Sequence, residues 1–368
     1  MALPVLLMSG PAGDSPAERF VAQGQRAAAC DLTLRLRAVP GLGPLHALCA
    51  EDADRQTLQD LGGRPWQRPQ GDFHFGRALA AFAAEHGAGG LAYFGGASAP
   101  LLDPAALEEA LAWLAAQAGP AAVVNNRYST DWCVLNGVAG LADLAERLPT
   151  DNPLGWQLEH AAGFRVRALA PCAATRADVD TPSDLLLLDG HPGLGPSLMA
   201  FLEAAPADAR ARVGAIRRAL STRASTIALI GRTSSHVWRS LEARGQIWVR
   251  LLVEERGMIA SGRAARGEVR SWVAMMLETW GAQGFVERLA RMCDAALWDT
   301  RVWMAARGPW PSARDRFAAD LGWPDQVQEP GLRALTAALA RSPVPVLSGG
   351  HGVVAGSIYA LLESLPAA

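Results

Sequence analysis

Residues 177–188 read ADVDTPSDLLLL, a short acidic stretch followed at once by an apolar run. Asp178 and Asp180 are two positions apart on a segment that we expect to be extended, so their carboxylates point the same way. Two carboxylates in this arrangement suit a divalent cation held against phosphate groups. The string therefore predicts a metal-binding pair.

The same string also has the features of a helix start. Thr181 fits the N-cap, Pro182 the first helical position and Asp184 the third. An ordinary solvated capping box explains these residues as well as a ligand site does. The sequence leaves both interpretations open.

Short apolar runs alternate with segments of helical spacing before this string. The predicted strands are 3–9, 43–50, 89–95, 121–125 and 131–136, and the predicted helices are 75–86, 104–117 and 138–148. Strands that alternate with helices are typical of a mostly parallel α/β sheet. The Gly- and Pro-rich segment DGHPGLGP (189–196) then indicates a linker.

The alternation resumes after this linker. The predicted strands are 225–230, 246–253, 295–298 and 343–347, and the predicted helices are 207–220, 268–280 and 283–293. A chain of 368 residues is too long for one ordinary core. We therefore expect two α/β domains, 1–190 and 191–368, each with a mostly parallel sheet.

The segment DVDTPSDL (178–185) resembles the signature near the end of the nucleotidyltransferase domain in MobA-like and CofC-like proteins, which have a GT-A-type fold. The resemblance covers about residues 1–190, and the C-terminal half resembles no family that we recognise. It implies a domain that binds a nucleoside triphosphate with Mg²⁺ at Asp178 and Asp180. The nucleotidyl group would pass to a phosphorylated or cofactor-type small molecule.

Two other family motifs are altered in this chain. The Gly-rich loop after the first strand corresponds to MSGPAGDSPAER (8–19), where Gly10, Gly13 and Arg19 stand in. All 34 basic residues are Arg, so the family's Lys is missing. In YFGGASAPLLD (93–103), Ala-Pro-Leu-Leu matches the tail of the metal-binding motif, but Gly-Ala-Ser replaces its Asp. The predicted nucleotide contacts from this second segment are Gly95, Gly96 and Ser98.

A further polar cluster, NNRYSTD (125–131), directly follows a predicted strand. Residues after a parallel strand lie at the carboxyl edge of the sheet, where ligands bind. The cofactor-binding candidates here are Asn125, Asn126, Tyr128 and Ser129. Asn, Asp and Ser also favour ordinary turns, which is the structural alternative.

The C-terminal half repeats one plan four times, with a strand, a polar or Gly-rich loop and then a helix. The loops are GRTSSH (231–236), EERGM (254–258), DTR (299–301) and SGGHG (348–352). If the strands are parallel, all four loops emerge at one edge, with helix N-termini at 234 and 352 that suit an anion. We predict His236 or His351 as a general base, and Ser234, Ser235, Glu254, Arg256, Gly349 and Gly350 as ligand contacts.

Composition narrows the class of partner. The formal net charge of −2 gives no reason to expect nucleic acid or an anionic membrane, and no apolar run is long enough to span a bilayer. The five cysteines are scattered without a CxxC pair, which suits a reducing cytoplasm. We expect a cytoplasmic protein whose partners are a nucleotide and a small phosphorylated metabolite.

Three functions remain open at this point. The chain is a nucleotidyltransferase-like enzyme that uses Mg²⁺, a non-catalytic nucleotide sensor, or a phosphatase or phosphotransferase with its site in the C-terminal domain. The sequence leaves the base, the acceptor and the oligomeric state open.

Overall fold

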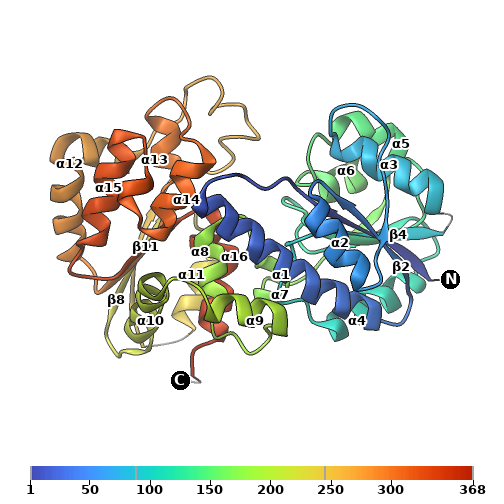
Figure 1. Cartoon of the computed structure of the whole chain (residues 1–368), viewed down its shortest axis with the longest axis horizontal. Helices are drawn as coiled ribbons and strands as arrows, with labels where there is room; N and C mark the ends of the chain where they lie inside the picture. The colour runs from blue at the N-terminus through green and yellow to red at the C-terminus, as the bar shows by residue number, and fades with distance from the viewer. Residues whose placement is uncertain (1, 88, 244–245, 367–368) are drawn as a thin grey trace. The chain divides into compact units, whose positions relative to one another are not determined.

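In the computed structural model the chain folds around two separate β-sheets (Figure 1). The structure describes residues 2–87, 89–243 and 246–366. Contacts divide the chain into two units: unit 1 contains the residues up to Ala12, Gln25–Asp178 and Gly193–Leu198, and unit 2 contains Gly13–Gly24, Val179–Pro192 and the residues from Met199 onward. The α/β fold with two sheets is as predicted. The units interleave along the chain, whereas the sequence predicted one boundary after residue 190.

Unit 1 contains a mixed seven-stranded sheet. Its strands are β1 (Leu3–Ser9), β2 (Leu42–Cys49), β3 (Arg64–Pro65), β4 (Gly90–Gly95), β5 (Ala121–Val124), β6 (Trp132–Asn136) and β7 (Arg165–Ala168). They lie in the order β3-β2-β1-β4-β6-β5-β7, and β6 alone among them is antiparallel to its neighbours. The five strands predicted before residue 140 are confirmed, whereas β3 and β7 were not predicted.

Helices cover both faces of this sheet. They are α1 (Pro16–Ala38), α2 (Asp52–Asp60), α3 (Phe75–His86), α4 (Pro104–Ala115), α5 (Leu141–Leu144) with the 3₁₀ turn η1 (Ala145–Arg147), α6 (Leu154–His160) and α7 (Ala173–Arg176). One buried cluster joins the sheet to α1, α2 and α4, and a second joins its other face to α3, α5 and α6. The strands therefore read as nearly continuous apolar runs, because both faces are buried.

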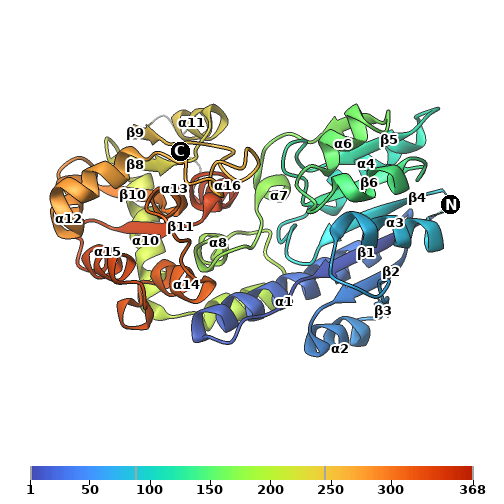
Figure 2. The same cartoon turned by 90° about the horizontal axis from the view of Figure 1, so that it is seen from above.

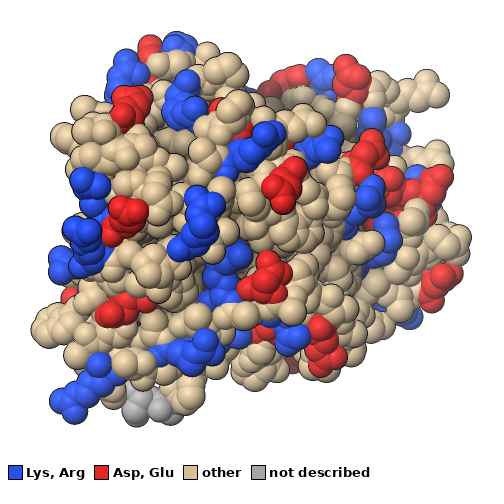
Figure 3. All heavy atoms as spheres, turned by 60° about the vertical axis from the view of Figure 1, so that its left-hand side comes forward, with Lys and Arg blue, Asp and Glu red and all other residues tan. Residues whose placement is uncertain are grey.

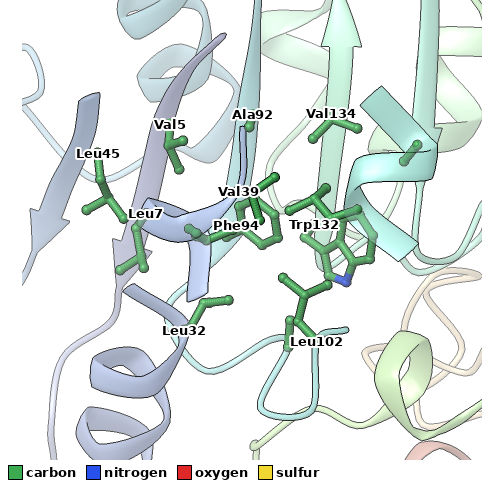
Figure 4. Packing of buried hydrophobic residues seen from close by; sticks show 14 of the residues in the cluster. Val5, Leu7, Leu32, Val39, Leu45, Ala92, Phe94, Leu102, Trp132 and Val134 are labelled. Atoms are coloured by element: carbon green, nitrogen blue, oxygen red, sulfur yellow. The ribbon is translucent and has the colours of Figure 1, made fainter. Parts of the chain in front are cut away.

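Phe94 and Trp132 occupy the centre of the first cluster, with Leu32 and Leu102 close by (Figure 4). The two rings stack with centroids 5.4 Å apart and planes inclined by 16°. They lie on the adjacent strands β4 and β6, where they face each other in the register. This pair fixes how the antiparallel strand sits against the parallel part of the sheet.

Helix α1 corrects one prediction. Ser15 Oγ accepts a hydrogen bond from the backbone N–H of Glu18, and the Glu18 carboxylate accepts one from the N–H of Ser15. This reciprocal capping opens a 23-residue helix at Pro16. The loop predicted over 8–19 is thus shorter, and Arg19 lies on the helix, where it donates to the carbonyl of Asp14. Part of α1 belongs to each unit.

Unit 2 contains a four-stranded sheet, β8 (Thr226–Gly231), β9 (Trp248–Val253), β10 (Ala295–Asp299) and β11 (Val346–Gly349). The order is β11-β10-β8-β9 and every neighbouring pair is parallel, as predicted. Its helices are α8 (Pro182–Leu188), α10 (Ala207–Ser221), α11 (Ser235–Glu242), α12 (Trp272–Ala290), α13 (Arg301–Ala306), α14 (Ala313–Leu321), α15 (Pro330–Ala340) and α16 (Gly356–Glu363), with the 3₁₀ turns η2 (Pro324–Gln326) and η3 (His351–Val354). Helix α9 (Pro196–Glu203) contributes residues to both units.

Two of the predicted helices form a single kinked element in the structure. The predicted helices 268–280 and 283–293 correspond to α12, which bends at Gly281 with φ of 65°. Glycine reaches this left-handed conformation without a Cβ penalty. In the described part of the chain, no helix combines the length and hydropathy needed to cross a bilayer.

Replacement of Trp132 tests the core of unit 1. Trp132→Ala should lower the free energy of unfolding by about 3–5 kcal/mol, because it leaves a large cavity. Trp132→Phe should cost clearly less, since the indole Nε1 is buried without a hydrogen-bond partner in the structure. Urea unfolding followed by circular dichroism measures both, with Trp238→Ala at an exposed position as control. Equal losses for the two Trp132 variants would contradict this account of the core.

Candidate functional site

The string that opened the sequence analysis forms the capped start of α8, as predicted. The Asp184 carboxylate accepts hydrogen bonds from the N–H and Oγ1 of Thr181, at 2.9 and 2.8 Å. Its other oxygen accepts one from Ser357 Oγ on α16, at 2.8 Å. All seven residues of α8 are buried. The capping box is therefore enclosed in unit 2, rather than solvated as the structural alternative had it.

Enclosure changes the acid strength of Asp184. Desolvation, followed by the nearby charge of Asp180, raises the pKa of Asp184 to about 7. The hydrogen bonds from Thr181 and Ser357 act in the opposite direction and only partly offset this effect. Asp184 is thus a buried carboxyl group that titrates near neutrality.

The predicted metal-binding pair precedes this helix. Asp178 is half-buried and Asp180 is exposed. Among the residues that the structure describes, no group of three or more His, Cys, Asp or Glu side chains could share a metal ion. Mg²⁺ binds proteins through one or two carboxylates and takes its remaining ligands from phosphates and water, so a pair fits this cation only together with a nucleotide.

The Gly-rich loop after β11 packs against α8. A Cβ on Gly352 would lie 1.9 Å from Asp184 Oδ1, and one on Gly349 would lie 2.7 Å from Ser183 Cβ. Ser183 Oγ also donates to the carbonyl of Ser348, at 2.6 Å. Close packing therefore accounts for these glycines without a ligand. The predicted helix start at 352 is wrong, because a 3₁₀ turn comes first and α16 begins at Gly356.

The carboxyl edge of the unit 2 sheet brings several ionisable groups together. The chain leaves β8 toward β9 on one side, while β10 and β11 lie on the other, so the strand order reverses between β8 and β10. Ligands of open α/β sheets bind at such a switch point. Arg232 follows β8 and Asp299 ends β10, and the two meet there.

Arg232 and Asp299 form a two-bond ion pair. Arg232 Nε lies 2.6 Å from Asp299 Oδ2, and Nη2 lies 3.1 Å from Oδ1. Burial opposes ionisation of Asp299, but the charge and hydrogen bonds of Arg232 outweigh it, and the net effect lowers the pKa of Asp299. Gly231, with φ of 119°, permits the close approach, since a Cβ there would lie 2.6 Å from Asp299 Cβ.

His351 adjoins this pair. Its Nε2 lies 3.0 Å from the carbonyl oxygen of Arg232, which can only accept, so Nε2 carries the proton. Desolvation, followed by the guanidinium charges of Arg232 and Arg256, lowers the pKa of His351 to about 4. The ring is neutral at pH 7, which leaves Nδ1 as a proton acceptor. The role of His351 as a base stays a prediction.

Two polar atoms near this edge have no partner in the structure. Glu254 Oε1 accepts from Ser271 Oγ at 2.7 Å, but Glu254 Oε2 is buried without a hydrogen bond. Thr233 Oγ1 is also buried and unbonded. Desolvation raises the pKa of Glu254. Sequence reasoning named Glu254 but missed Thr233 and Ser271, which no motif distinguishes.

A second buried ion pair stabilises the segment that directly follows β10. Arg301 donates to both carboxylate oxygens of Asp320, at 3.0 and 2.6 Å, and to Thr300 Oγ1. Desolvation opposes the charge of Arg301, but Asp320 more than compensates and raises the pKa of Arg301. The pair links the start of α13 to α14, so it stabilises the loop after β10.

The other predicted residues of this half have separate places. Ser234 is the N-cap of α11 and accepts from the N–H of Val237, while Ser235 and His236 are exposed on the first turn of that helix. Arg256 is exposed after β9. Of the two predicted bases, His351 contacts the Arg232–Asp299 pair, whereas among the described residues no hydrogen bond joins His236 to it.

The carboxyl edge of unit 1 also has a switch point, between β1 and β4, because β2 and β3 lie on the other side of β1. The N–H of Gly96, directly after β4, donates to the carbonyl of Met8 within β1 at 2.6 Å, which continues the pairing of these two strands. Ser98 Oγ donates to the carbonyl of Gly95 at 2.8 Å and so closes its own turn. A Cβ on Gly10 would meet open space.

A polar cluster that the sequence analysis missed follows β1. Ser9 Oγ donates to Asp54 Oδ2 at 2.9 Å, and Arg26 Nε pairs with Asp54 Oδ1. Glu51 accepts from the N–H of Ala12 at 3.1 Å and so anchors the loop. Two acidic residues in the first turn of α2 were the available sequence signal.

The cluster after β5 is largely structural. Asn125 is buried and bonds to the N–H groups of Asp131 and Trp132 and to the Asp131 carboxylate, which closes the turn into β6. Asn126 Oδ1 accepts from the N–H of Tyr128. Ser129 Oγ donates to Asn152. Tyr128 remains largely exposed and is the member of this set whose side chain is most open to a ligand.

Two hollows lie away from these edges. One of about 620 Å³ in unit 1 lies near the start of β1 and the end of β6, which is the opposite end of the sheet from the predicted nucleotide loops. The other, of about 240 Å³ in unit 2, lies among α12, α13 and α15. Neither is lined by a predicted site residue.

Comparison with known proteins gives a partial likeness only. No protein-family model matches the sequence, and no curated protein does. Among solved structures, the chain is similar to a CMP:2-keto-3-deoxy-manno-octonic acid synthetase complexed with CTP, with 15% identity, 50% of this chain and 95% of that chain covered, and a TM-score of 0.34. It is also similar to a cytidylyltransferase from Leptospira borgpetersenii serovar Hardjo-bovis, with 14% identity, 55% and 93% coverage, and a TM-score of 0.39. At such scores neither likeness decides an activity.

The buried carboxyl of Asp184 predicts a pH-dependent stability. Because its folded-state pKa of about 7 lies above the usual 3.8, the folded chain binds this proton more tightly than the unfolded chain. Its contribution to the free energy of unfolding therefore falls as the pH rises from about 4 to about 7. Asp184→Asn should remove this part of the pH dependence of the free energy of unfolding, which urea unfolding measures across the same pH range. The exposed Asp143→Asn is the control, and an unchanged pH dependence in Asp184→Asn would contradict the assignment.

Proposed function

We propose that the chain is a nucleotidyltransferase-like protein that binds a nucleoside triphosphate at the β1–β4 edge of unit 1. The observation that carries this proposal is the switch point between these strands, each of which is followed by a Gly-containing loop. Such crevices hold ligands in open α/β sheets, and bare backbone N–H groups suit phosphate. The resemblance at 178–185 agrees with this reading.

The residues available near this edge determine how the phosphates can be bound. On the face shown in Figure 3, charged side chains of both signs are scattered among uncharged ones. The chain has no Lys, and the phosphates therefore depend on backbone N–H groups, Arg and a cation. Gly10, with free space around it, offers the closest approach of backbone to ligand.

Mg²⁺ is the proposed cation, and the resemblance implies Asp178 and Asp180 as its ligands. When bound, it would neutralise charge that develops on the phosphoryl group. The protein's own part in nucleotidyl transfer is to orient the triphosphate and a phosphorylated or cofactor-type acceptor. A sensor that binds the nucleotide without transfer would use the same contacts but would need no acceptor.

A second candidate function is phosphate-ester chemistry in unit 2. The specific observation is that a neutral His351 adjoins the Arg232–Asp299 pair at a switch point. Here Nδ1 of His351 would act as the base, and Arg256 would attract the anion. Inorganic phosphate would stabilise the protein without a nucleotide under this alternative.

A thermal-shift titration with ATP, GTP, CTP and UTP, with and without Mg²⁺, tests the proposed function. One triphosphate should raise the melting temperature, and Mg²⁺ should increase the shift. Gly10→Leu should weaken the binding of that triphosphate by at least about tenfold, because the leucine side chain would fill the ligand space. Asp180→Ala should remove the Mg²⁺-dependent part.

Gly119→Leu is the matched control, since Gly119 also has open space at Cβ but precedes β5 at the opposite edge of the sheet. It should bind as the unmodified protein does. Absence of a shift with every triphosphate, or equal loss in both glycine variants, would overturn the proposed site. A shift with inorganic phosphate alone would favour the unit 2 alternative.

A further inference from the structure

Strand β9 is the exposed edge of the unit 2 sheet. It pairs with β8 on one side and ends the strand order on the other (Figure 2). Its sequence, WVRLLV, has a single charged residue, and its register with β8 is regular over all six residues. Edge strands are usually protected by charged side chains, Pro, bulges or short length. Of these devices β9 has only the charge of Arg250.

The apolar surface continues from the strand to the start of α12. Ser271 Oγ and the N–H of Val273 both bond to Glu254, directly after β9, which holds the first turn of α12 beside the strand. The exposed apolar side chains of β9 and of the start of α12, which together we term the β9 patch, are Trp248 (69% exposed), Leu251 (37%), Val253 (53%), Trp272 (65%) and Met275 (58%), with Trp248 on the opposite face of the sheet from Leu251 and Val253.

This patch has about the area of the largest apolar patch on a typical monomer, and such patches are often functional. From these fractions the five side chains expose on the order of 600 Å², before the strand backbone is counted. Each partner in a standard specific interface buries about 800 Å². Two copies of the β9 patch thus have nearly the area that a stable dimer needs.

The hydrogen-bonding directions fix how two copies would pair. The N–H groups of Trp248 and Glu254 bond to β8, so the even-numbered residues face that strand. By alternation, the N–H and C=O groups of Val249, Leu251 and Val253 point outward. We propose that β9 pairs with β9 of a second copy of this chain, antiparallel and with the two-fold axis at Leu251.

Leu251 is the middle one of the three outward-facing residues, so an axis there pairs the whole strand, and charge excludes one alternative. With the axis at Leu251, the two Leu251 residues exchange both backbone bonds, Val249 faces Val253 of the other copy, and Arg250 faces Leu252. An axis at Arg250 would place two guanidinium groups opposite each other, which is destabilising. Arg250 Nε is held by the carbonyl of Met292 at 2.7 Å, so its charge is kept within its own chain. The result is a self-complementary, isologous interface that joins two four-stranded sheets.

Sedimentation velocity of the full chain at micromolar concentrations tests the pairing. The unmodified protein should sediment as a dimer, and Leu251→Lys, which places two ammonium groups on the axis, should halve the sedimenting mass. Met199→Lys, at an exposed apolar position of α9 outside the patch, should stay dimeric. A monomeric unmodified protein, or a dimeric Leu251→Lys, would overturn the proposal and leave the patch to a different partner.

Oxidative cross-linking tests the register without depending on a destabilised variant. The paired Leu251 residues would have Cα atoms about 5.5 Å apart, which a disulfide can span. Leu251→Cys should therefore form a covalent dimer under mild oxidation, whereas Trp248→Cys, at the end of the strand, should not cross-link to itself. The unmodified chain, with five cysteines of its own, gives the background. Equal cross-linking of the two variants would contradict the two-fold at Leu251.

Discussion

The ion pair between Arg232 and Asp299 is the interaction on which the carboxyl edge of unit 2 depends. Asp299 is wholly buried, and a buried carboxylate without a partner would cost several kcal/mol. Two charge-assisted hydrogen bonds from Arg232 keep it ionised and join the ends of β8 and β10. The ion pair also constrains the backbone, because only a glycine at 231 leaves room for it.

Other properties of this edge follow from that pair. The carbonyl of Arg232 fixes the tautomer of His351, and the guanidinium charge helps to keep its ring neutral. Asp299 also raises the pKa of Glu254 slightly, after desolvation and against three hydrogen bonds. Each sheet thus brings polar loops to one edge at a switch point, in unit 1 around glycines and in unit 2 around buried charge. The first arrangement underlies the proposed triphosphate site, and the second underlies the alternative proposed for unit 2.

The sequence predicted the parts of this structure that depend on local pattern. Apolar runs located β1, β4, β8 and β10, because strands buried on both faces are continuous in hydropathy. The capping box at Thr181 was found because it lies within four consecutive residues. The burial of Asp184 could not be predicted, since it depends on Ser357 and Gly352, which are far away in the chain. For the same reason the glycines of 348–352 suggested a ligand loop, whereas they permit close packing on α8.

The hypothesis that two strands are joined through buried charge is tested most directly by a double-mutant cycle on Arg232→Gln and Asp299→Asn. Each single change leaves one buried charge without its partner and should lower the free energy of unfolding by about 3–5 kcal/mol. The double variant removes both charges, so its loss should be smaller than the sum of the single losses by at least about 1 kcal/mol. Additive losses would mean that the two side chains act independently, and would contradict the central role given to this pair.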